Sequence, residues 1–265
     1  MKGTVVITGA SGGIGKSTAE RFADSGWEVF NLSRRPAALS GVTDIATDVT
    51  DENSVVSAFE QIAALSGKID LLICNAGFGI SGAVEFTRLE DAKAQFDVNF
   101  FGVFSCVKYA LPLLKKSRGR ILCISSAAAV FSIPFQAFYS ATKASVNLLA
   151  SALRNELRQF GVTACAVQLG DVRTGFTNAR KKSFAGDALY GGIISRSVSV
   201  MEKDEQHGMD PQQIADSVYK IGNKKRVRVL YTLGMKYKIF CVIQKLLPAS
   251  CVSFIVGKLY MPKEH

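Results

Sequence analysis

The residues with the clearest chemical potential are a tyrosine and a lysine spaced one helical turn apart. Of the seven tyrosines, only Tyr139 has a lysine, Lys143, four residues further on. The segment 139–160 carries apolar residues at helical spacing, so both side chains should leave the same helix face. Ser126 ends an apolar, β-branched run upstream of this helix. A phenol, an ammonium group and a hydroxyl together can move protons at an alcohol or a ketone.

The chemistry follows from the acidity of these groups. Phenol is a weak acid with a pKa of about 10, and an ammonium group held nearby favours the phenolate. Tyr139 would then take a proton from an alcohol or give one to a ketone, while Ser126 holds the substrate oxygen. Taken alone, Tyr139 and Lys143 could be an ordinary surface pair, so the other motifs decide the interpretation.

A glycine-rich stretch at 8–15 (TGASGGIG) joins a strand-like run to a helix-like one. Its glycines Gly9, Gly13 and Gly15 allow a tight turn and a close approach of pyrophosphate to the backbone. The helix that begins near Ile14 would point its amides and the positive end of its dipole at the phosphates. Ser11 adds a hydroxyl donor. The stretch predicts a dinucleotide site, with a plain tight turn as the alternative.

The end of the second predicted strand, NLSRRP, indicates which dinucleotide binds. An acidic side chain usually accepts the ribose 2′-hydroxyl here, but this chain offers Ser33, Arg34 and Arg35, which suit a 2′-phosphate. We therefore favour NADP(H) over NAD(H). Further cofactor contacts are predicted at the ends of the next two strands, at Asp48, Val49, Asn75, Ala76 and Gly77. Asn99 is polar among aromatics and needs a buried partner.

Strand-like and helix-like segments alternate through the first two thirds of the chain, which is typical of βαβ units. The predicted strands are 4–8, 28–33, 44–47, 71–75, 120–125, 163–169 and 227–231. The predicted helices are 14–25, 53–65, 89–115, 139–160 and 211–221. The fold class is therefore α/β, a doubly wound, parallel, seven-stranded sheet of the Rossmann type in a single domain, 1–265. The stretch 175–210 has no clear strand, and we interpret it as a substrate loop or lid.

Composition limits the remaining possibilities. The six cysteines lack metal-finger spacing, so we predict no metal site and free thiols in a reducing, cytoplasmic compartment. We expect no membrane span. The net charge is +10, and the extension 232–265 is basic and interleaved with aromatics. We interpret it as a solvated basic face, with peripheral membrane contact as the alternative and no nucleic-acid partner.

The chain resembles the short-chain dehydrogenase/reductase family in the order and spacing of its motifs. These motifs are the glycine stretch, Asn75-Ala-Gly, Asn99, Ser126 and the Tyr139–Lys143 pair. The resemblance covers about residues 2–174. It implies that Asn99, Ser126, Tyr139 and Lys143 form a catalytic tetrad, that Asn99 orders a water and that Lys143 binds the nicotinamide ribose. It also implies cofactor contacts from Val172 and Thr174. One departure is Leu169-Gly170, where the family usually has Pro-Gly, which puts the local loop geometry in question.

The substrate is expected to be a small hydrophobic secondary alcohol or ketone, of a steroid, bile-acid or lipid type, because the residues expected around it are apolar. These are Phe78, Ile80, Val130, Phe131, Ile133, Pro134, Phe135 and Phe176, with Phe184, Leu189, Tyr190, Ile193, Ile194 and Met201 closing over them. The C-terminal extension resembles that of the steroid- and retinoid-handling members. Two alternatives remain, a reductase of 3-ketoacyl thioesters and a non-catalytic NADP(H)-binding regulator. Surplus apolar residues on the helices 89–115 and 139–160 predict a homodimer or homotetramer. The alternative is a monomer in which the basic C-terminal extension covers that surface.

Overall fold

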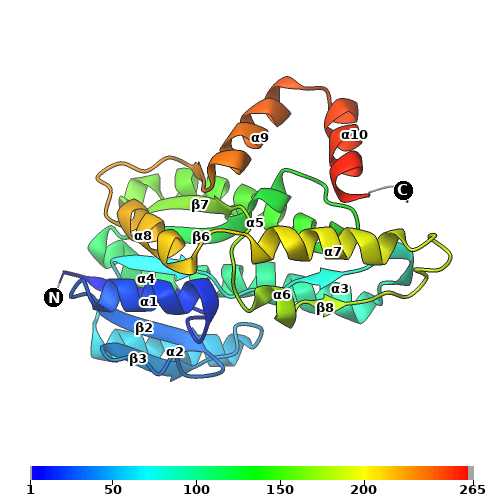
Figure 1. The fold of residues 1–265 in the computed structure, drawn as a ribbon. Helices are drawn as coiled ribbons and strands as arrows, with labels where there is room; N and C mark the ends of the chain where they lie inside the picture. The colour runs from blue at the N-terminus through cyan, green and yellow to red at the C-terminus, as the bar shows by residue number, and fades with distance from the viewer. Residues whose placement is uncertain (1, 262–265) are drawn as a thin grey trace.

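A parallel seven-stranded sheet forms the centre of the molecule in the computed structural model, which describes residues 2–261 (Figure 1). The strand order is β3-β2-β1-β4-β6-β7-β9, and every neighbouring pair is parallel. The strands are β1 (Thr4–Thr8), β2 (Glu28–Ser33), β3 (Val42–Ala46), β4 (Leu71–Cys74), β6 (Arg120–Ser126), β7 (Thr163–Leu169) and β9 (Leu230–Thr232). The chain reverses its direction of winding between β1 and β4, which confirms the predicted doubly wound fold and places a ligand crevice at that point.

Helices cover both faces of the sheet because the strands are apolar on both sides. In β1, Val5 and Ile7 pack in one core cluster, while Val6 between them packs in the other. The first cluster includes side chains of α1 (Gly13–Ala23) and α8 (Pro211–Gly222). The second includes side chains of α2 (Glu52–Leu65), α4 (Gly102–Ser117) and α5 (Ala137–Glu156). The sheet is thus held rigidly between two helical layers.

The segment predicted as one helix, 89–115, is interrupted in the structure. It consists of α3 (Leu89–Phe96), a π-helical turn (Asp97–Phe101) and α4. Leu89–Ser117 is long and apolar enough to cross a membrane by composition, but Val103, Cys106 and Val107 of this stretch are buried in the core. We therefore interpret it as a core helix of the fold. The helical course from Leu89 to Ser117 confirms the predicted helix, and the π-helical turn within it, which was not predicted, positions Asn99.

The stretch 175–210 has more regular structure than the sequence indicated. It contains α6 (Phe176–Ala179), a two-residue strand β8 (Lys181–Lys182) and the long helix α7 (Ile193–Gln206). β8 pairs in parallel with β5 (Ile80–Ser81) as a separate small sheet. The prediction that this stretch lacks a strand was wrong, because β8 forms only through its tertiary pairing with β5.

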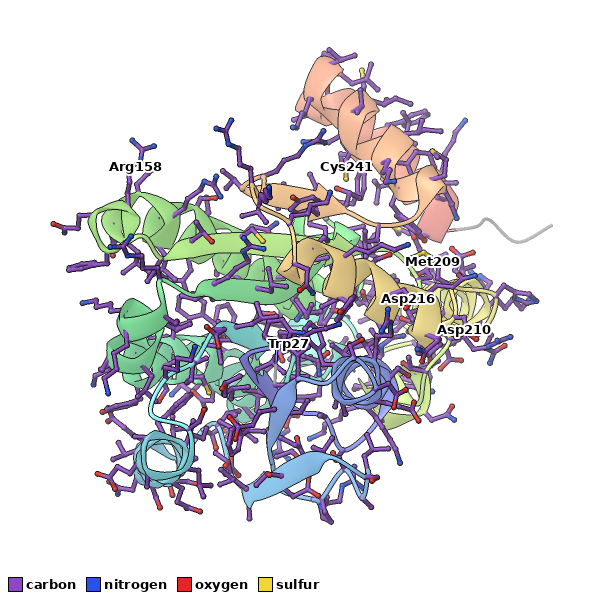
Figure 2. The ribbon with its side chains drawn as sticks, turned by 90° about the vertical axis from the view of Figure 1, so that its left-hand side faces the viewer. Trp27, Arg158, Met209, Asp210, Asp216 and Cys241 are labelled. Atoms are coloured by element: carbon purple, nitrogen blue, oxygen red, sulfur yellow. The ribbon has the colours of Figure 1, made fainter. Side chains whose placement is uncertain are left out.

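Two further helices follow the last strand and project from the body of the molecule (Figure 1). They are α9 (Met235–Leu246) and α10 (Ala249–Tyr260), which we call the C-terminal hairpin. Single 3₁₀ turns occur at Val84–Phe86, Ala127–Ala129 and Arg158–Phe160. In Figure 2 the hairpin again stands away from the sheet and its covering helices.

Candidate active site

The glycine-rich turn between β1 and α1 has a shape that only glycines can adopt. Gly9 and Gly13 have positive φ angles of 72° and 53°, in the left-handed region that favours glycine. A Cβ atom on Gly15 would lie 2.5 Å from Nδ2 of Asn75 and closer still to the carbonyl oxygen of Gly9. The turn therefore leaves bare backbone at the start of α1, and this cradle fits the pyrophosphate of a dinucleotide.

Buried side chains that the sequence interpretation did not single out hold this turn in place. Asn31, in the middle of β2, accepts a hydrogen bond from the amide of Ala10 at 3.0 Å and donates one to Asp44 at 2.7 Å. The Thr8 hydroxyl accepts from the amides of Asn75 and Ala76, each at 2.9 Å. The available signal was an asparagine within the otherwise apolar run of β2, since a buried amide needs partners.

The residues predicted to recognise the adenosine end lie together along one cavity of about 1140 Å³. Its walls include Ser11, Ser33, Arg34, Asp48 and Val49. Hydrogen bonds from Thr50 lower the pKa of the Asp48 carboxyl, and the nearby charge of Arg34 adds to this effect. The guanidinium of Arg34 is exposed. Arg34 therefore offers an exposed cation at this end of β2, where a 2′-phosphate would lie.

Ser126, Tyr139 and Lys143 meet in the same cavity. Ser126 ends β6, and α5 carries Tyr139 and Lys143 on one face. The hydroxyl of Ser126 lies near enough to the phenol of Tyr139 to favour its phenolate form by hydrogen bonding. The ammonium of Lys143 donates to the carbonyl oxygen of Ile124 at 3.0 Å and lies 5.8 Å from the ring centre of Tyr139. The predicted trio is thus one physical cluster.

Burial has the largest effect on the acidity of this cluster. It raises the pKa of Tyr139 to about 12, although the hydrogen bond from Ser126 works in the opposite direction. Burial also lowers the pKa of Lys143 to about 8. We expected Lys143 to supply part of the stabilisation of the phenolate and the positive charge of the oxidised nicotinamide to supply more. In the protein alone, the pKa of Tyr139 stays above its ordinary value of about 10. Desolvation penalises both charged forms, and it is the largest influence on the pKa of each group.

Asn99 lies beside this cluster, as predicted, and is fully buried. Its side-chain oxygen accepts from the amide of Phe78 at 3.0 Å, and its amide group donates to the Phe78 carbonyl at 2.9 Å and to the Thr142 hydroxyl at 3.1 Å. A Cβ atom on Gly77 would lie 3.1 Å from Oδ1 of Asn99 and 3.6 Å from Nζ of Lys143. Asn99 therefore fixes the chain after β4 next to Lys143, and its role in ordering a water stays a prediction.

The loop after β7 brings Val172 and Thr174 to the cavity wall. Val172 is buried, and a methyl of Thr174 lies within 4 Å of the position of a Cβ atom on Gly13. Gly170 matches the Pro-Gly pattern of the family and has a structural reason, because a Cβ atom there would overlap the ring of Tyr237 in α9. Gly170 thus lets the C-terminal hairpin pack against the end of β7. The departure itself, leucine in place of proline at Leu169, has no structural explanation.

The substrate part of the cavity agrees only partly with the predicted lining. Phe78, Phe131, Ile133 and Phe176 line it, but Ile80, Val130, Pro134 and Phe135 are not among its lining residues. None of the six residues expected to close over the substrate lines the cavity; α7 buries Ile194 and Met201 against the body. Instead the C-terminal hairpin forms this wall, through Tyr237, Phe240, Ile243, Leu247, Val252, Ile255, Val256, Leu259 and Tyr260.

One corner of the cavity is acidic, which the sequence interpretation missed. Asp171 follows β7, and Asp204 and Glu205 come from α7. Burial raises the pKa of Asp171 to about 7, and the two other carboxylates add to this effect. The Tyr237 hydroxyl donates to Asp171, and Arg180 pairs with Glu205. These groups come from two helices, α7 and α9, and from two connecting segments, so their meeting is a property of the tertiary fold.

Comparison with known proteins agrees with this geometry. The family model described as short chain dehydrogenase matches residues 3–184. A 3-ketodihydrosphingosine reductase of Bacteroides thetaiotaomicron is 40% identical over 225 residues, which cover 83% of this chain and 84% of the relative.

Solved structures give the same result. A short-chain dehydrogenase from Streptomyces avermitilis superposes on this protein with a TM-score of 0.84 at 25% identity. The superposed residues make up 97% of this chain and 96% of the Streptomyces chain. The structure of ElxO with NADP bound has a TM-score of 0.74 at 26% identity, covering 90% of this chain and all of ElxO. The glycine cradle, the Ser126–Tyr139–Lys143 cluster and these matches establish that the chain belongs to the short-chain dehydrogenase/reductase family.

Proposed function

We propose that this protein is an NADP(H)-dependent oxidoreductase that interconverts a secondary alcohol and a ketone on a long-chain, lipid-like substrate. The observation that carries the proposal is the cavity itself. Its floor holds Ser126, Tyr139 and Lys143, and its outer wall is the largely apolar inner side of the C-terminal hairpin. An apolar wall of this kind suits an alkyl chain better than a sugar. The 40% identity to a 3-ketodihydrosphingosine reductase favours a lipid within the hydrophobic class.

The residues divide the chemical work between them. A bound nicotinamide would supply or accept the hydride at the carbon that carries the substrate oxygen. Ser126 holds that oxygen by a hydrogen bond, and Tyr139 gives it a proton in reduction or takes one in oxidation. Lys143 holds the ribose and keeps a positive charge near the phenol. Because the protein alone leaves the pKa of Tyr139 at about 12, oxidation requires further stabilisation of the phenolate in the complex.

A preference for NADP(H) rests on the end of β2. Ser33 and Arg34 stand where an acidic residue would accept the 2′-hydroxyl of NAD(H). The hydroxyl of Ser33 donates to the backbone carbonyl of Arg35 at 2.6 Å, and both Arg34 and Arg35 are exposed, but only Arg34 lies close enough to Asp48 to lower the pKa of its carboxyl. ElxO, a structural neighbour, has NADP bound.

Replacing Arg34 with alanine should weaken NADPH binding by tenfold to a hundredfold and leave NADH binding almost unchanged. A charge-assisted hydrogen bond contributes about 1.5–3 kcal/mol, which corresponds to that range. Calorimetric titration with NADPH and with NADH measures the change in affinity for each cofactor. Arg158→Ala, which removes an exposed arginine from a 3₁₀ turn (labelled in Figure 2), is the matched control. Equal losses for both cofactors would assign Arg34 another role.

The substrate class is tested by a panel of ketones presented with NADPH and, separately, with NADH. We expect the highest kcat/KM for a free long-chain amino ketone of the sphingoid type. Activity confined to a carrier-bound 3-ketoacyl thioester would select the thioester reductase, and the highest kcat/KM for a steroid ketone would contradict the long-chain assignment. Tight NADPH binding without turnover of any ketone would favour the non-catalytic regulator.

The proposal includes a homodimer or homotetramer formed through α4 and its neighbour α5. Phe101, Phe104 and Leu148 expose about half or more of their surfaces at these helices, although Val103, Val146 and Leu153 are buried. The C-terminal hairpin does not cover these exposed side chains, so it is no obstacle to pairing. The mass of the protein in solution decides this point. We also propose a cytoplasmic location, which fits the buried free thiols of Cys74, Cys106, Cys123, Cys165 and Cys241.

A further inference from the structure

The C-terminal hairpin has an unusually apolar outer surface. Leu246, at the tip between its two helices, is 78% exposed, and Phe254 on α10 is 64% exposed. Further exposed apolar side chains of the hairpin are Met235, Ile239, Val242, Ile243, Leu247, Ile255 and Leu259. In contrast, Cys241 (labelled in Figure 2) and Val256 are buried. A contiguous apolar surface on an element that projects into solvent usually marks a place where something binds.

The charges on the hairpin are all of one sign. Residues 235–261 include Lys236, Lys238, Lys245 and Lys258 but neither aspartate nor glutamate. Lys236 lies 3.9 Å from Asp204 of the body, whereas Lys238, Lys245 and Lys258 are exposed. Exposed lysines interleaved with apolar side chains complement an anionic lipid surface, which takes apolar groups between its head groups and attracts cations. A second copy of the hairpin would bring lysines against lysines.

The hairpin is attached firmly at its base and lines the cavity with its inner side. The ring of Tyr237 packs over Gly170, and its hydroxyl donates to Asp171. Phe240 and Ile255, one from each helix, line the same cavity as Tyr139. Leu246 and Phe254 do not line it. The outer surface therefore includes side chains that take no part in the substrate wall, Leu246 and Phe254 among them. Ile243, Leu247, Ile255 and Leu259 belong to both, because they are partly exposed and also line the cavity.

We propose that the C-terminal hairpin docks on an anionic lipid bilayer, with Leu246 and Phe254 inserted between the lipids and the three exposed lysines at the head groups. The cavity then opens next to the acyl chains, and a lipid substrate reaches Tyr139 without crossing water. The docking stands independently of the reaction, while the delivery of substrate rests on the proposed function.

Sedimentation with vesicles tests the docking directly. The full-length protein is mixed with vesicles of phosphatidylcholine alone or with added phosphatidylglycerol. We expect binding to the anionic vesicles that weakens as salt is added, because salt screens the lysines. The double variant Leu246→Glu, Phe254→Glu should bind at least tenfold more weakly. Its matched control is Leu65→Glu, Leu89→Glu, at two leucines that are 63% and 64% exposed on the body.

A second variant keeps the test valid if the Leu246→Glu, Phe254→Glu protein fails to fold. Lys238→Gln, Lys245→Gln keeps every apolar contact and should lose affinity only for the anionic vesicles. Absence of binding by the wild-type protein, or equal binding by all variants, would overturn the proposal. A doubled mass in light scattering that the Leu246→Glu, Phe254→Glu variant abolishes would instead identify a second copy as the occupant, and would overturn it too.

Activity assays separate this proposal from the proposed function. Turnover of a short, water-soluble ketone should be unchanged in both hairpin variants, while turnover of a vesicle-embedded ketone should fall with vesicle binding. Vesicle binding without turnover of any ketone would reject the proposed function and leave the docking intact. Turnover of the embedded ketone that does not change when vesicle binding is lost would reject delivery through the hairpin.

Discussion

Tyr139→Phe is expected to abolish turnover while leaving NADPH binding nearly intact. The substitution removes only the hydroxyl that exchanges a proton with the substrate and lies beside Ser126 in the cavity. The ring stays, with its tilted contact to Phe176 at a centroid distance of 5.7 Å, so the cavity should keep its shape. Proton transfer by a positioned side chain contributes roughly 10²–10⁴-fold to the rate, and we expect a loss in that range. Steady-state rates and calorimetric binding of NADPH measure the two effects.

The control for this experiment is Tyr219→Phe. Tyr219 lies on α8 with the guanidinium of Arg21 over its ring, and it is not among the residues that line the cavity. The turnover rate of the Tyr219→Phe protein should equal that of the wild-type protein. A Tyr139→Phe protein that kept a tenth of the activity would rule out the phenol as the proton donor, and a parallel loss of NADPH binding would mean that the variant disturbs the cofactor site instead.

The sequence predicted the inner part of this site well because its residues follow buried strands. β1, β2 and β7 begin and end where the apolar runs indicated, since strands buried on both faces read as continuous apolar segments. The carboxyl ends of parallel strands meet along one edge of the sheet, so the residues after β1, β4 and β6 were bound to come together. The pairing of Ser126 with Tyr139 follows from this topology.

The interruption of the helix 89–115 could not be read from its apolar spacing. Asn99 sits in a π-helical turn and exchanges two hydrogen bonds with the backbone of Phe78, which is 21 residues away in the chain. Such π-helical turns often occur at functional sites. The turn could not be recognised from the helix sequence alone, because the Asn99 side chain bonds to Phe78, which lies in the segment after β4. Helical periodicity records which face of a helix is buried, whereas this distortion depends on a long-range contact.

The outer wall of the cavity was assigned to the wrong segment for a similar reason. Phe184 and Leu189 are apolar and were expected to cover the substrate, but both are exposed and neither lines the cavity. The extension that contains α9 and α10 was interpreted as a solvated basic face, with peripheral membrane contact as the alternative, and no wall of the cavity was assigned to it. Gly170, whose missing side chain admits the ring of Tyr237, determines where α9 packs. A contact of this kind leaves no periodic signal in the sequence.

A substitution in the glycine-rich turn between β1 and α1 is expected to have the second large effect, on the binding of NADPH. Gly15→Ala is expected to remove measurable NADPH binding, because the new methyl group would lie 2.5 Å from Nδ2 of Asn75 and still closer to the carbonyl oxygen of Gly9. Both are fixed, since the Asn75 amide group donates to the carbonyls of Thr8 and Gly9 at 3.0 and 3.2 Å. The turn must therefore shift as a unit, and overpacking of this kind costs about 1–3 kcal/mol of folding free energy. Fluorescence titration with NADPH and a thermal unfolding curve report the two consequences.

Gly12→Ala in the same turn is the matched control. Gly12 has an extended backbone with φ near −172°, and a Cβ atom there would meet no other atom within 4 Å among the described residues. Its NADPH affinity and its Tm should stay close to those of the wild-type protein, because alanine adopts this conformation without strain. If Gly15→Ala bound NADPH as well as Gly12→Ala does, the close approach of Gly15 to Gly9 and Asn75 would not be what shapes the cofactor site. If Gly12→Ala also lost binding while keeping its Tm, the phosphates would have to lie against Gly12 itself.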